Sequence, residues 1–189
     1  MSSRVWLAAA ALVLPVTAQA GDAMMSKGMK ATQFTVRIEN VSTTSTLKGM
    51  NGMTAPAPNS PGVWVIQKMP ARLFQPGKLE QGWGLESQAE WGDPSMLAEH
   101  CMHHEGVVAS GVFNTPVGDE KPGPALPGKA YEFTITAKPG EKLAFTTMFG
   151  QSNDLFYAPA EGGIALFDSY GRPKAGDVTS QVALWDAGT

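Results

Sequence analysis

Three aspartates near the end of the chain each stand where an apolar, strand-like run meets a turn. Asp154 precedes the run 155–157, whereas Asp168 and Asp186 each follow one. If neighbouring strands bring these carboxylates to one edge of a sheet, their mutual repulsion favours a cation between them. Calcium prefers such oxygen ligands, so the arrangement suggests a hard-metal site with calcium as the first candidate. Aspartate is also a common turn former, and each carboxylate could instead bond its own turn.

A second group of candidate metal ligands fills five consecutive positions. It holds all three histidines and the single cysteine of the chain, as His100, Cys101, Met102, His103 and His104. Imidazole and sulfur ligands suit copper or zinc. On a helix the first and last histidines share a face and can chelate together. This cluster defines an alternative function, copper binding and handling in the periplasm. The competing explanation is a solvated helix end with a half-buried cysteine.

The segments that must position these groups are mostly strand-like. Periodicity and apolar runs predict strands at 33–39, 63–66, 107–113, 131–136, 143–149, 164–167 and 178–185. The turn at 139–142 between two of them indicates a β-hairpin. Only residues 79–104 have a helical pattern, in which Asp93 is expected to cap a helix and Pro94 to take its first position. The pattern favours an all-β fold, an antiparallel β-sandwich with one or two short helices in a long connection.

The N-terminus has the three parts of a secretory signal peptide. Arg4 supplies positive charge, residues 5–16 are apolar, and Ala18 and Ala20 form a small-residue cleavage site. The apolar run is shorter than the roughly 20 residues that a membrane-spanning helix needs. We therefore expect a signal peptide over 1–20, a flexible leader over 21–32 and one domain over 33–189. The protein is expected to be secreted, to the periplasm or the cell surface.

Composition narrows the function further. The formal net charge of −3 argues against nucleic acid as a partner, and no second apolar run is long enough to span a membrane. A single cysteine excludes an intrachain disulfide. The chain has no G-x-S-x-G nucleophile elbow, and its glutamates at 86, 90 and 99 fit exposed helix faces better than acid–base pairs. We therefore expect a protein that is not an enzyme.

Three segments resemble bacterial spondin-type domains, which are relatives of the N-terminal domain of F-spondin and mindin. They are residues 111–116, residues 139–156 and the ending Trp185-Asp186-Ala187-Gly188-Thr189. The resemblance runs from about residue 33 to the end and is most specific after Ser110. It implies a β-sandwich similar to a C2 domain, with a calcium site formed by loops at one edge. Asp154 and Asp186 would then be ligands, with Asp168 and Asn153 as further candidates.

Together these observations predict a secreted β-sandwich that binds a divalent cation at one edge. Its expected role is adhesion or ligand binding, with a protein or a glycan as the partner. Calcium is the expected ion, and copper or zinc belongs to the alternative at residues 100–104.

Overall fold

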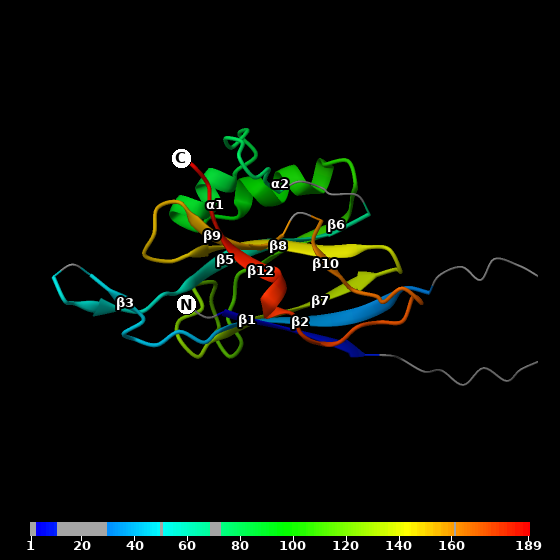
Figure 1. Ribbon diagram of the computed structural model, residues 1–189, viewed down its shortest axis with the longest axis horizontal. Helices are drawn as coiled ribbons and strands as arrows, with labels where there is room; N and C mark the ends of the chain where they lie inside the picture. Colours follow the sequence, from blue (N-terminus) through cyan, green and yellow to red (C-terminus); the bar gives the residue numbers. More distant parts are fainter. Residues whose placement is uncertain (1–2, 11–29, 50, 69–72, 161) are drawn as a thin grey trace, which may run out of the picture.

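Two antiparallel sheets are stacked face to face, and two short helices cover the outer face of the larger one (Figure 1). This computed structural model describes residues 3–10, 30–49, 51–68, 73–160 and 162–189, with the backbone alone for 3–10. Strands greatly outnumber helices in it. The predicted all-β class and antiparallel sandwich are therefore confirmed.

The larger sheet has the strand order β12-β9-β8-β5-β6, with β10 also paired to β8. Its strands are β5 (Asn59–Gln67), β6 (Val107–Phe113), β8 (Lys142–Phe149), β9 (Leu155–Pro159), β10 (Ile164–Ala165) and β12 (Val182–Asp186). The smaller sheet has the order β11-β1-β2-β7. It comprises β1 (Ser3–Ala10), β2 (Thr32–Asn40), β7 (Ala130–Ala137) and β11 (Gly176–Asp177). A separate ribbon pairs β3 (Leu47–Lys48) with β4 (Thr54–Ala55), and a 3₁₀ turn, Thr179–Gln181, precedes β12.

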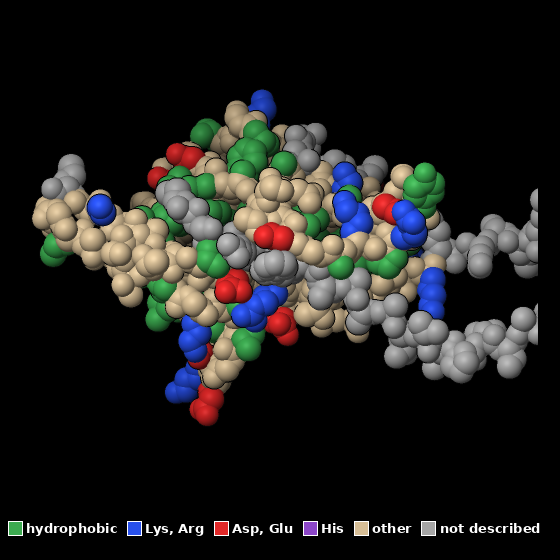
Figure 2. Space-filling model, turned by 60° about the horizontal axis from the view of Figure 1, so that its bottom comes forward, with side chains coloured by type: hydrophobic (Ala, Val, Ile, Leu, Met, Phe, Trp, Pro, Cys, Tyr) green, Lys and Arg blue, Asp and Glu red, His purple; other side chains and the backbone are tan. Residues whose placement is uncertain are grey.

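The main core lies between the two sheets. The alternation predicted for residues 33–39 places Phe34, Val36 and Ile38 of β2 inward, each at most 1% exposed. They belong to one apolar cluster with residues of the larger sheet such as Phe145. Arg37 of β2 instead forms ion pairs with Glu39 and with Glu132. On the side of the molecule at the bottom of Figure 1, Lys and Arg side chains are interspersed with Asp and Glu (Figure 2).

Strand β5 is buried on both faces, which explains why its apolar residues are consecutive instead of alternating. Ile66 belongs to the core between the sheets, with Trp64 packed against that core. Val63 and Val65 point to the opposite side and join a second core beneath the helices. A central strand covered on both faces requires apolar side chains in both directions.

The predicted hairpin at residues 131–149 is wrong. The two strands exist, but β7 pairs with β2 in the smaller sheet and β8 pairs with β5 and β9 in the larger one. The turn at 139–142 therefore joins the two layers instead of two neighbours in one sheet. A strand shows the same alternation of apolar and polar residues whether it pairs with the next strand in the chain or with a distant one. The sequence pattern therefore does not specify its partner.

The predicted helical segment forms α1 (Leu85–Trp91) and α2 (Ser95–His103). Gly92 separates them with a φ of 68°, a backbone conformation that favours glycine. Asp93 accepts hydrogen bonds from the backbone N–H and the hydroxyl of Ser95, at 3.0 and 2.6 Å. Pro94 occupies the capping position, one residue earlier than predicted. Neither helix, nor any other in the described part of the chain, has the length and apolar character needed to span a membrane.

The expected N-terminal boundaries fall largely outside the described residues. Cleavage after Ala20 and most of the leader 21–32 lie within residues 11–29, which the structure does not describe. Residues 3–10 of the expected signal peptide form β1, paired with β2 along its whole length. The first strand within the expected domain 33–189 is β2, which begins at Thr32.

Candidate functional site

Strands β9 and β12 bring two of the predicted ligands to one edge of the larger sheet. The strands are antiparallel, with Asp186 opposite Leu155, so Asp154 lies beside the end of β12. The backbone N–H of Ala187 donates to the carbonyl oxygen of Asp154 at 2.9 Å, which fixes this pairing beyond the last strand residue. Asp154 and Asp186 therefore lie at one end of the sheet, but Asp154 is opposite Ala187 and Asp186 is opposite Leu155, so their side chains leave opposite faces of the strand pair.

A carboxylate of α1, that of Glu90, approaches Asp154. The Thr189 hydroxyl lies 2.7 Å from Oδ1 of Asp154 and 3.2 Å from Oε1 of Glu90. A hydroxyl has one hydrogen, so it donates to only one of these two oxygens at a time. Sequence reasoning placed Glu90 on an exposed helix face, and no local pattern indicated its approach to residue 189. Asp154, Glu90, Asp186 and the Thr189 hydroxyl are called the acidic edge below.

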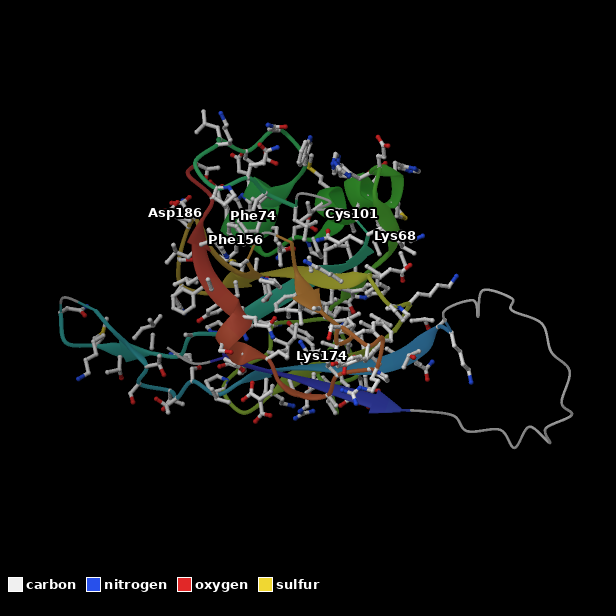
Figure 3. The ribbon with its side chains drawn as sticks, turned by 45° about the vertical axis from the view of Figure 1, so that its right-hand side comes forward. Lys68, Phe74, Cys101, Phe156, Lys174 and Asp186 are labelled. Carbon is white, nitrogen blue, oxygen red and sulfur yellow. The ribbon has the colours of Figure 1, made fainter. Side chains whose placement is uncertain are left out.

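The side chains of the acidic edge keep oxygen lone pairs available. Asp186 is exposed at the end of β12 (Figure 3), and its Oδ1 accepts one hydrogen bond, from the Gly188 N–H at 2.8 Å. Asn153, the fourth predicted ligand, is exposed in the turn that leads into β9, directly before Asp154. A carboxylate has about four lone-pair sites, so these groups retain capacity for an ion or for water.

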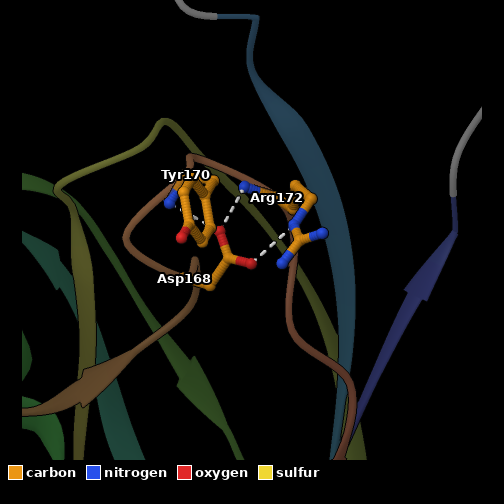
Figure 4. Close-up of polar contacts among 3 residues, drawn as sticks. All are labelled: Asp168, Tyr170 and Arg172. Atoms are coloured by element: carbon orange, nitrogen blue, oxygen red, sulfur yellow. Dashed lines mark hydrogen bonds and ion pairs between the residues drawn. The ribbon is translucent and has the colours of Figure 1, made fainter.

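Asp168 makes its contacts within its own turn (Figure 4). Its Oδ1 accepts from the backbone N–H groups of Tyr170 and Arg172, each at 2.9 Å, and its Oδ2 is 2.7 Å from Nε of Arg172. These hydrogen bonds, with that from the Arg172 backbone foremost, lower the pKa of the Asp168 carboxyl. The turn-forming explanation accounts for all these contacts, and Asp168 has none with the acidic edge among the described hydrogen bonds.

The three carboxylates and the hydroxyl of the acidic edge do not make a complete metal shell. Within the described ranges, no three His, Cys, Asp or Glu side chains are grouped closely enough to hold a metal ion. Any cation at the acidic edge would need backbone oxygens, the Asn153 amide or water for the remainder of its 6 to 8 ligands.

The histidine–cysteine–methionine cluster is divided between the two faces of α2. Cys101 is 1% exposed and packs in the second core, whereas Met102 and His103 point to solvent. Burial raises the pKa of the Cys101 thiol to about 12. Thiolate is the form that binds soft metals, so a buried neutral thiol is a poor ligand.

His100 and His104 do share a face, as the helical spacing predicted. Their ring centroids are 5.1 Å apart, and Trp83 stacks on the His100 ring at 4.7 Å. Nε2 of His100 is buried and has no hydrogen-bond partner among the residues that the structure describes. Burial lowers the pKa of His100, and the neighbouring His104 lowers it further. The five-residue cluster thus reduces to one pair of imidazoles that can chelate together.

Comparison with protein-family models, with curated proteins and with solved structures gave no match for this chain.

Proposed function

We propose that this chain is a secreted, spondin-type β-sandwich that binds a divalent cation, with calcium as the first candidate, at the acidic edge. Its role would be adhesion or ligand binding, without catalysis, toward a protein or glycan partner in the periplasm or at the cell surface. The observation that carries the proposal is the approach of Asp154 and Glu90 to the Thr189 hydroxyl, at the end of the β9–β12 pair where Asp186 also lies.

The physical argument is electrostatic. Asp154 and Glu90 both approach the Thr189 hydroxyl, which can donate to only one of them, and Asp186 adds a third negative charge at the same edge. A cation bound there would reduce the repulsion among these acids and hold the ends of β9 and β12 to α1. With so few protein ligands, the affinity would be in the range of extracellular modules, about 10⁻⁴ to 10⁻³ M.

A thermal melt with and without calcium tests the proposal. With a Kd of about 1 mM, 10 mM calcium would stabilise the fold by about 1.4 kcal/mol, which raises Tm by about 3–6 °C. Asp154→Asn should abolish this shift, whereas the matched control Asp168→Asn should retain it, because Asp168 is bonded within its own turn. An unchanged Tm in 10 mM calcium, or equal loss of the shift in both variants, refutes the site.

The contact between His100 and His104 supports a second candidate, a copper or zinc site of two imidazoles on α2. Isothermal titration with Zn(II) or Cu(II) tests it, with His104→Ala as the disrupting variant. His103→Ala is the matched control, because His103 lies exposed on the same helix. Binding that survives His104→Ala, or that is lost equally in both variants, contradicts a chelating pair.

A further inference from the structure

An aromatic cavity of about 290 Å³ lies beside the acidic edge, between the segment 73–85 and the ends of β9 and β12. Figure 3 shows Phe74, Phe156 and Asp186, from three separate segments, at the same corner of the molecule. The residues that give the cavity its chemistry are Phe74, Lys78, Trp83, Phe156, Trp185 and Asp186. Aromatic, aliphatic and charged residues thus line it together.

The aromatic floor is already fixed by its own contacts. The Phe74 ring lies 5.1 Å from that of Phe156 and 4.8 Å from that of Trp185, measured between centroids. The Trp185 indole N–H donates to the Ala158 carbonyl at 3.1 Å. These rings continue the second apolar core outward, so an apolar group in the cavity would extend that core. A preformed floor lowers the entropic cost of binding.

Three charged side chains border the cavity, and one of them is already engaged. Glu80 Oε1 accepts hydrogen bonds from the backbone N–H groups of Trp83, Gly84 and Leu85, at 2.7, 3.0 and 3.2 Å. Lys78 and Asp186 are exposed, and neither forms an ion pair within the part of the chain that the structure describes. Among the described residues, the border therefore offers a ligand the Lys78 ammonium and the Asp186 carboxylate, whose Oδ1 also accepts from the Gly188 N–H.

We propose that this cavity binds an α-amino acid with a large apolar side chain. The side chain would lie on the aromatic floor, the ligand ammonium at Asp186 and the ligand carboxylate at Lys78. A carboxylic acid without an ammonium would be repelled by the negative charge of Asp186. An amine without a carboxylate would be repelled by the positive charge of Lys78. The volume is at the lower end of small-molecule pockets, about 300 Å³, which fits one amino acid better than a glycan chain.

Titration calorimetry of the full chain with four probes tests this proposal. L-phenylalanine carries all three recognised groups, whereas phenethylamine lacks the carboxylate, 3-phenylpropionate lacks the ammonium and serine lacks the apolar side chain. We expect phenylalanine to bind at least tenfold more tightly than each of the others, because each lacks one recognised contact. No heat from phenylalanine at 10 mM, or tighter binding of either singly charged probe, overturns the proposal.

Charge-removing variants assign each contact. In Lys78→Gln, phenylalanine and phenethylamine should bind equally, and in Asp186→Asn, phenylalanine and 3-phenylpropionate should bind equally. Lys174→Gln is the control, because Lys174 is exposed and does not border the cavity. An unchanged preference among the probes in Lys78→Gln and Asp186→Asn refutes the assignment of the two charges.

The test separates this inference from the proposed cation site. Asp186 belongs to both, so calcium and phenylalanine should compete, whereas Asp154 does not border the cavity. Asp154→Asn should therefore abolish the calcium shift and leave phenylalanine binding unchanged. Binding of 3-phenylpropionate only in the presence of calcium would overturn the amino-acid proposal while supporting the cation site.

Discussion

Truncation of Phe156 to alanine should destabilise the protein by about 3 kcal/mol. The ring is 1% exposed and packs edge-on against Phe74. Phe→Ala changes in sealed cores cost about 3–5 kcal/mol, because a void adds to the lost transfer free energy. Phe156 borders the open cavity beside the acidic edge, so water can reach the space left by the ring. The lower end of that range therefore applies.

Two comparison variants make this magnitude testable. Phe145→Ala removes a ring that is 0% exposed between the two sheets and should cost about 5 kcal/mol, at the upper end of the range. Leu79→Ala removes a cavity-lining side chain that is 78% exposed and should cost less than about 0.5 kcal/mol. Urea denaturation with comparison of m-values measures all three. The reasoning is refuted if Phe156→Ala lowers the free energy of unfolding only as much as Leu79→Ala does, or more than Phe145→Ala does.

Three further predictions concern the helices and their surroundings. The pKa of the Cys101 thiol is raised to about 12, so at pH 8 it should react with a disulfide reagent about 1,000-fold more slowly than a thiol with the ordinary pKa of 9.0. In urea, where the chain is unfolded, Cys101 should react at the ordinary rate. A fast reaction of the folded protein contradicts the burial of Cys101. Burial lowers the pKa of His100, so as the pH decreases through 6.5 the unfolded chain takes up a proton before the folded chain does, and the free energy of unfolding should fall. In His100→Gln this pH-dependent contribution should disappear. If the free energy of unfolding, measured in urea, has the same pH dependence in both proteins, His100 makes no such contribution. Gly92→Ala should cost about 1–3 kcal/mol, because φ is 68° and the new Cβ would lie 2.7 Å from that of Ser60. Gly118→Ala, also at positive φ but with open space around it, should lower the free energy of unfolding by less in the same urea assay. If both variants lower it equally, the contact with Ser60 is unimportant.

Local patterns predicted the strands well because strand periodicity is a property of a few consecutive residues. The alternation at residues 33–39 and the run at 63–66 correspond to β2 and β5, and both patterns follow from how many faces of the strand are covered. The same local information failed at residues 131–149, where two correctly predicted strands join different sheets. Pairing is decided by distant segments, which a short window does not contain.

In the candidate sites, too, some features follow from the local sequence and others only from contacts between distant segments. Helical spacing by itself determined that His100 and His104 share a face, because residues four apart on one helix are neighbours whatever surrounds them. Only the tertiary structure decided that Cys101 faces the core, that Glu90 approaches Thr189, and that Phe74 and Lys78 border a cavity with Asp186. Those relations depend on the packing of α1, α2 and the segment 73–85 against β9 and β12. Such packing is set by burial over the whole chain, since contacts between residues far apart in sequence leave no periodic signal along it.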